Sequence, residues 1–308
     1  MMKEISQTAE RFDAGPLDRT EDNIFRASDS KQPRWETAES VHENNNATID
    51  ARYTASLSKN PLWNAHEVLQ RPVPIRTAYG ETITNNIDRI VEGPDAEIRA
   101  LWQKYKDKVT ITKPGYKGNE AYYSCDEGGV TQNIEVAAKG DAIDTPYQVS
   151  FHEFGHNIDY LINRTDGDGK PGKFFSESYK DGLLGKTAKQ EAESFLLQRW
   201  KEHRDKTGQR LLPEKFYSMV QKELMTAIPL LERGDISDIF EGATNGKLCL
   251  GAGHGKEYWQ HRDNGKEVFA EMFSASICNF GSLNNIKKYF PETYKVFQEM
   301  VKIAGGKV

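Results

Sequence analysis

Two histidines in the pentapeptide His152-Glu153-Phe154-Gly155-His156 restrict the fold of this chain more than any other feature of its sequence. Residues four positions apart lie one turn apart on the same face of an α-helix, so the pentapeptide predicts a helix with both imidazoles on one side. Two such imidazoles bind one Zn²⁺ through nitrogens at about 2 Å. The glutamate between them lies beside the metal, where it can accept a proton from zinc-bound water. The neighbouring residues are uncharged, which indicates that this helix is buried.

The pattern of the surrounding chain predicts an α+β fold. Residues 109–112 are typical of a strand, and residues 121–125 and 130–137 are typical of a hairpin with a glycine turn. Asp144-Thr145-Pro146 is typical of a helix start, and the helix of the pentapeptide is expected to run to about Asn163. We therefore expect a small mixed sheet over this helix, followed by a mostly helical C-terminal half. Helical spacing recurs over residues 93–105, 187–203, 213–231, 266–276 and 291–301.

The polarity of the chain changes near residue 60. Residues 1–60 are polar and their apolar residues keep no steady period, so this segment buries too little apolar surface to offset the entropy cost of ordering it. We predict a polar, flexible N-terminal arm over residues 1–60 and one domain over residues 61–308. The length of 308 residues allows one large domain.

Charge and hydropathy argue against several classes of protein. Lys and Arg number 41 against 46 Asp and Glu, and the absence of a basic block argues against nucleic-acid binding. No apolar run approaches the roughly 18 residues of a membrane span, and the first residues lack the apolar core of a secretory signal. Cys125, Cys249 and Cys278 are too few and too far apart for a disulfide scaffold or a cysteine zinc site. We expect a chain that is cytoplasmic as synthesised.

Zinc needs a third protein ligand. The extended metzincin pattern fails, because its next positions are occupied by Asp159 and Ile162. Glu267 and Glu271 are better placed, since they lie one turn apart on a later helix beside the apolar Phe269. Two carboxylates near an apolar surface need partners, and a metal and a histidine N–H supply one each. Helix geometry alone does not decide which of the two binds the metal, and a solvated helix face with two ordinary glutamates is the alternative.

The pentapeptide, followed by the helix of Glu267, Phe269, Ala270 and Glu271, resembles the gluzincin peptidases and, among them, the lethal-factor-like group. The segments 235–240 and 253–259 are similar to zincin domains attached to phage minor head (MuF-type) proteins and to related toxin-like proteins. The resemblance covers roughly residues 90–305. It implies a zincin-like peptidase fold, peptide or protein substrates, and Zn²⁺ held by His152, His156 and Glu267, with Glu271 bracing a histidine. It also suggests that the N-terminal arm joins a carrier module or a phage particle.

Two features depart from that family. Lethal-factor-like enzymes usually place a catalytic tyrosine seven residues before the ligand glutamate, and here that position is Gln260. Tyr258 lies nine residues before Glu267, and His261 lies six before it. Glu267 also follows His156 by 111 positions, which exceeds the usual gluzincin separation. We therefore expect a helical insertion at about 175–245.

Further residues are candidates for the cleft around the zinc. Tyr258 is the first choice to stabilise the tetrahedral oxyanion, and His254 and His261 are the alternatives. His254 could also replace Glu267 as a ligand. Asp159 follows His156 by one turn and could orient an imidazole or serve as a cap. The strand at 130–137 could be the sheet edge that pairs with an extended peptide.

These inferences together predict a zinc metalloendopeptidase of gluzincin type. Zn²⁺ polarises the scissile carbonyl and activates water, and Glu153 is the general base. One rival interpretation is a phage structural or head-associated protein whose zinc site only stabilises it. Another is a delivered, toxin-like effector with a single target. The intact Glu153 argues against a decayed site.

Overall fold

The computed structural model describes residues 71–251, 253, 254, 256–259 and 264–306. These residues belong to one compact unit, Leu69–Val308. The predicted N-terminal arm and His261 lie outside the described residues. No described helix has the length and apolar character needed to cross a membrane.

A four-stranded mixed sheet lies in the N-terminal half, as predicted. It is formed by β1 (Val73–Pro74), β2 (Thr110–Ile111), β3 (Tyr122–Ser124) and β4 (Gly129–Thr131), in the order β1-β2-β4-β3. β2 and β4 are parallel, and the other two pairs are antiparallel. β4 therefore lies inside the sheet, and the prediction of an edge strand at 130–137 is wrong. Asn133 ends the strand segment because its side chain accepts a hydrogen bond from Glu135 N and caps a short helix, α5 (Ile134–Ala137).

The remainder of the described chain is mostly helical, which confirms the α+β class and the helical C-terminal half. Each stretch with helical spacing in the sequence is helical in the structure. Five helices, α3, α5, α7, α10 and α12, were not predicted individually. The principal helices are α3 (Ile75–Ile90), α4 (Ala96–Tyr105), α6 (Gln148–Asp166), α7 (Phe175–Ser178), α8 (Leu183–Thr207), α9 (Pro213–Ala227), α10 (Gly234–Ala243), α11 (Gly265–Cys278), α12 (Phe280–Tyr289) and α13 (Pro291–Gly305).

The helix of the pentapeptide, α6, begins later than the sequence predicts. Tyr147 has a left-handed backbone with φ of 65°, and the helix starts at Gln148. The side-chain Oε1 of Gln148 accepts hydrogen bonds from Thr145 N and Thr145 Oγ1, both at 2.9 Å. A side chain inside the first turn thus binds the preceding segment, in place of the predicted cap at Asp144.

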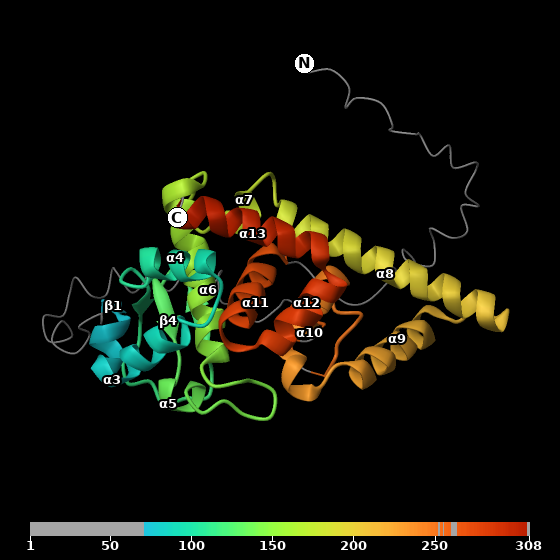
Figure 1. Cartoon of the computed structure of the whole chain (residues 1–308), viewed down its shortest axis with the longest axis horizontal. Coiled ribbons are helices and arrows are strands. Elements are labelled where there is room, and N and C mark those ends of the chain that lie inside the picture. Colours follow the sequence, from blue (N-terminus) through green and yellow to red (C-terminus); the bar gives the residue numbers. More distant parts are fainter. Residues whose placement is uncertain (1–70, 252, 255, 260–263, 307–308) are drawn as a thin grey trace, which may run out of the picture. The chain divides into compact units, whose positions relative to one another are not determined.

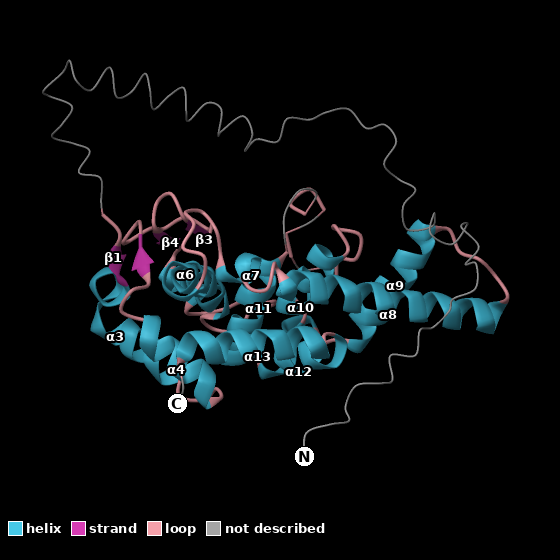
Figure 2. Cartoon of the chain, turned by 90° about the horizontal axis from the view of Figure 1, so that it is seen from above, coloured by secondary structure: helices cyan, strands magenta, loops and turns pink. Residues whose placement is uncertain are grey.

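Helix α6 lies between the small sheet and α11 (Figure 1). Figure 2 shows the same arrangement with α6 seen nearly end-on beside the strands. On the sheet side, the buried Asn157 accepts a hydrogen bond from Thr110 N at 3.1 Å. On the other side, Gly155 permits close packing, because a Cβ added there would lie 3.0 Å from the Cα of Ala270. This contact brings the two carboxylates that flank Ala270 toward the histidines of α6.

Candidate metal centre

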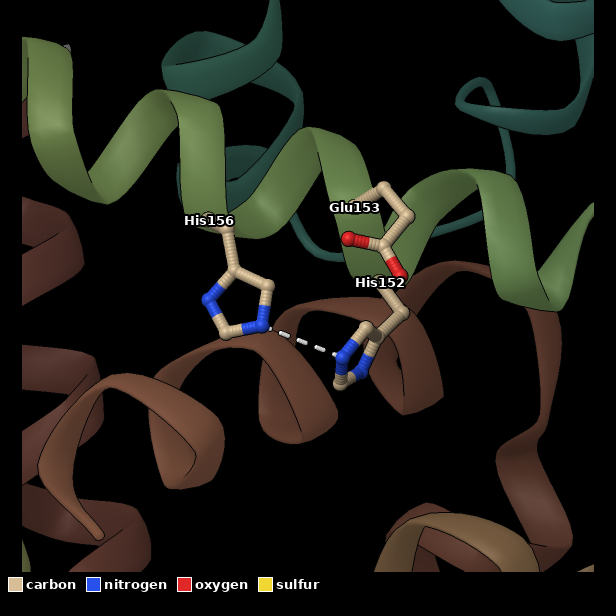
Figure 3. Close-up of side chains that lie close together, drawn as sticks. All are labelled: His152, Glu153 and His156. Carbon is tan, nitrogen blue, oxygen red and sulfur yellow. Dashed lines mark hydrogen bonds between the residues drawn. The ribbon is translucent and has the colours of Figure 1, made fainter. Parts of the chain in front are cut away.

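The two histidines of the pentapeptide extend from one side of α6, one turn apart, as helical periodicity requires (Figure 3). Their Nε2 atoms lie 3.1 Å apart. His156 is buried, and 12% of the side chain of His152 is exposed. Together with Glu153, they form a group that could hold a metal ion, with one ligand atom from each residue.

Glu267 reaches the same point from α11. Its Oε2 lies 3.1 Å from His156 Nε2 and 3.5 Å from His152 Nε2. Glu267 is only 1% exposed, so its charge is compensated inside the protein rather than by water. The structure therefore brings together two imidazole nitrogens and one carboxylate oxygen from residues that are up to 115 positions apart in the chain.

Glu271 occupies a different place from Glu267, although both lie on the same helix. Its Oε1 lies 3.1 Å from the other nitrogen of His152, Nδ1. An Nδ1–H donated to this carboxylate leaves the Nε2 lone pair of His152 free to face His156 and Glu267. The Nδ1 atom of His156 is buried and has no hydrogen-bond partner among the described residues.

The charges of these groups are strongly coupled. Burial disfavours the charged form of His152, but the carboxylates of Glu271 and Glu267 outweigh it and raise the pKa of His152 well above its usual value. Burial also opposes ionisation of Glu267, yet the two histidines hold its pKa well below the ordinary range. Burial raises the pKa of Glu271, and Asp238 and Asp235 add to this effect.

A segment after α10 covers the centre with two aromatic side chains. The hydroxyl of Tyr258 donates to Glu267 Oε1 at 2.5 Å. The ring of His254 stacks on that of Tyr258 with centroids 4.2 Å apart, and it lies 6.4 Å from the ring of His152. Asp238 binds His254 twice, at the backbone N and at Nδ1, each at 3.0 Å. Among the described residues, it is Glu267 and not His254 that contacts both histidines of α6.

A cavity of about 280 Å³ opens beside these groups. His152, Glu153 and His254 are among the residues that line it. Asp144, Asp235, Asp238 and Glu271 also line it, and burial together with Asp235 raises the pKa of Asp144 to about 6. No lysine or arginine of the described chain lines the cavity. The space next to Glu153 is thus large enough for a small group and strongly acidic.

Sequence reasoning left the role of Asp159 open and missed other residues. The carboxyl group of Asp159 accepts from Ser176 N at 2.9 Å and lies 2.5 Å from Ser176 Oγ, in the first turn of α7, which corresponds to the capping role and not to the orientation of an imidazole. Asp235 and Asp238 were not recognised as residues of the cleft. Their signal was available, since three acidic residues interrupt the otherwise apolar helix α10 and all three are buried.

Comparison of the chain with protein-family models, with curated protein sequences and with solved structures found no match.

Proposed function

We propose that this chain is a zinc-dependent peptidase of gluzincin type with a zincin-like fold. The observation that supports it most directly is the convergence of His152 Nε2, His156 Nε2 and Glu267 Oε2. These three residues would hold the metal, and Glu153 stands beside them at the cavity. The alternative interpretation is a metal site that only stabilises the fold, in a phage-associated or delivered protein.

The spacing of the three atoms fits zinc. Tetrahedral ligands at about 2.0–2.1 Å from one ion lie about 3.3 Å from one another. The observed separations are 3.1, 3.1 and 3.5 Å. Two imidazoles and one carboxylate are also a ligand set used by catalytic zinc, which leaves a fourth position open. Glu271 supports the assignment because it fixes the ring of His152 in the way that carboxylates brace metal-bound histidines.

Zinc bound here would supply a Lewis acid that polarises a carbonyl and favours ionisation of water. The chain supplies the remaining parts of the reaction. Glu153 accepts the proton of the attacking water and later delivers it to the leaving amine. His254, which lines the cavity, and Tyr258, whose ring stacks on that of His254, are donors that can stabilise a developing oxyanion. The acidic cavity accommodates substrate side chains next to Glu153.

The decisive experiment measures zinc and hydrolysis together. We expect the purified chain to contain one zinc per molecule by mass spectrometry and to hydrolyse fluorescein-labelled casein or a peptide library. Glu153→Gln should retain zinc and its melting temperature but lose at least about 100-fold in kcat, because only the proton acceptor is removed. The exposed Glu193→Gln on α8 is the matched control and should behave as wild type.

Two results would contradict the proposal. Equal casein hydrolysis by Glu153→Gln would mean that this glutamate is not the base. Stoichiometric zinc without hydrolysis of any library peptide would favour the stabilising metal site.

A further inference from the structure

The segment that carries His254, Tyr258 and Trp259 is attached along one side of α10. Four side chains of α10 and its C-terminal end accept hydrogen bonds from this segment. Ser237 Oγ accepts from Leu250 N at 2.9 Å, and Asp238 accepts from His254 N at 3.0 Å. Glu241 Oε2 accepts from Trp259 Nε1, and Thr244 Oγ1 accepts from Leu248 N, both at 3.0 Å. The acceptors stand at spacings of one, three and three residues, so they follow one face of the helix. The helix therefore fixes the course of this segment at several points.

The contact between Glu241 and Trp259 is buried on both sides. Glu241 is 0% exposed, and Trp259 is 1% exposed. An indole has a single N–H donor, so one fixed acceptor sets the rotation of the ring. Gly242 makes room for that ring, since a Cβ added there would lie 2.8 Å from Trp259 Cζ3. The acceptor on Glu241 and the space left by Gly242 thus both favour one orientation of the Trp259 ring.

Trp259 is linked to the candidate metal centre by the adjacent residue, Tyr258. The ring of Tyr258 meets that of Trp259 edge to face at 5.0 Å and stacks on His254 at 4.2 Å. The Tyr258 hydroxyl in turn lies 2.5 Å from Glu267 Oε1. A change in the tilt of Trp259 would therefore displace the phenol relative to Glu267 and to the cavity.

We propose that Glu241 is a positioning residue that acts through Trp259 to hold Tyr258 over the metal centre. This inference rests on the proposed function for its catalytic consequence, because Tyr258 is the proposed oxyanion donor. Burying a carboxylate is costly, and an apolar side chain of similar size would fill the same space. The carboxylate of Glu241 supplies what an apolar side chain cannot, which is an acceptor at the indole N–H.

The test compares Glu241→Leu with the conservative Glu241→Gln, whose amide oxygen can still accept the indole N–H. Casein hydrolysis should show a kcat that falls roughly 10- to 100-fold in Glu241→Leu, with KM and zinc affinity nearly unchanged. Glu241→Gln should recover most of that loss. Trp259→Phe removes the N–H donor and retains an aromatic ring, so its kcat should fall as much as that of Glu241→Leu. It replaces Glu241→Leu in the test if that variant does not fold. A fall in melting temperature with unchanged kcat per folded molecule would overturn the proposal.

A double-mutant cycle with Tyr258→Phe identifies the path. If Glu241 acts through Tyr258, Glu241→Leu should lower kcat no further once the hydroxyl is absent. If the double variant instead loses kcat by the product of the two single losses, Glu241 does not act through Tyr258 and the proposal is overturned.

Hydrogen exchange separates this proposal from the proposed function. The amide of Trp259 donates to Lys256 O at 3.3 Å, so its protection reports the placement of the segment. Glu241→Leu should accelerate its exchange, and Glu241→Gln should not, whether or not the protein hydrolyses casein. Identical exchange in wild type and Glu241→Leu would overturn the positioning role. Absence of casein hydrolysis in wild type would instead reject the peptidase.

Discussion

At the scale of single residues, Glu267 and Glu271 differ in what they contact although they lie one turn apart. Glu267 faces both Nε2 atoms, whereas Glu271 contacts Nδ1 of His152. The cause is the crossing of α11 over α6. That crossing places one carboxylate at the meeting point of the two rings and the other behind the first ring. The two glutamates should therefore fail in different ways when they are removed.

We expect Glu267→Ala to purify largely without zinc, because it loses a ligand. Glu271→Ala should retain zinc but bind it about 10- to 100-fold more weakly, the usual cost of losing a partner behind a metal-bound histidine. Competition with a chelator measures both affinities. His254→Ala is the control and should keep its zinc. Stoichiometric zinc in Glu267→Ala together with its loss in His254→Ala would identify His254 as the third ligand.

At the scale of elements, the approach of α6 to α11 depends on Gly155. An added Cβ would meet Ala270 Cα at 3.0 Å and Phe273 Cδ1 at 3.3 Å, and the backbone of α11 would have to yield. Alanine gains about 1 kcal/mol in helix propensity over glycine, but overpacking a core contact costs about 1–3 kcal/mol. These terms leave a modest net destabilisation.

We therefore expect Gly155→Ala to lower the free energy of unfolding by about 1 kcal/mol and to weaken zinc binding, since Glu267 moves with α11. Urea denaturation and chelator competition measure the two effects. Gly305→Ala in α13 is the matched control, because its Cβ would meet only ordinary contacts at 3.5 Å or more. Unchanged zinc affinity in Gly155→Ala would show that the spacing of the two helices does not set the ligand geometry.

A second pair of elements, α6 and α7, is joined by Asp159 and Ser176. Burial raises the pKa of Asp159 to about 8. The folded state therefore keeps this proton while the unfolded chain releases it near its ordinary pKa of about 4. Stability from this group is fully present below about pH 4 and decreases as the pH rises toward 8.

Asp159→Asn removes this dependence, because asparagine does not ionise and its side-chain oxygen can still accept from Ser176 N. Urea denaturation at pH 5 and at pH 8 measures the free energy of unfolding. Between pH 5 and pH 8 this free energy should decrease more in wild type than in Asp159→Asn. Equal changes in the two proteins would mean that Asp159 is ionised in the folded state at both values of pH.

At the scale of the whole molecule, the candidate metal centre lies entirely within the unit Leu69–Val308. Its groups come from α6, from α11 and from the segment that follows α10. We expect a chain without residues 1–60 to bind one zinc and to melt within a few degrees of the full chain, because the deleted segment is too polar to bury much surface. Calorimetry and zinc content are the measurements.

The control for that deletion removes α13 instead. This helix buries Phe297, Met300 and Val301 against the core, and its loss should abolish cooperative unfolding. A large loss of stability on deleting residues 1–60 would show that the predicted domain boundary is wrong.

The sequence by itself determined the features that depend on local periodicity. The helix of the pentapeptide, the stripe of α4 and the helical C-terminal half follow from apolar residues spaced at 3.6, and the α+β class follows from their order. The pairing of the two histidines is local too, because residues four apart on a helix share a face in any surroundings. The zinc and the peptidase activity remain predictions from that motif and its resemblance.

Tertiary structure decided everything that joins distant segments. The sequence does not say how closely α6 and α11 approach each other. The close packing of Gly155 on Ala270 places Glu267 beside the two histidines and Glu271 beside Nδ1 of His152. Packing also placed β4 inside the sheet and turned Asp159 toward α7. The anchoring of Tyr258 through Glu241 likewise exists only after α10 has folded against the later segment. The packing of whole elements decides which side chains meet, and residues on different elements carry no local signal that specifies their contact.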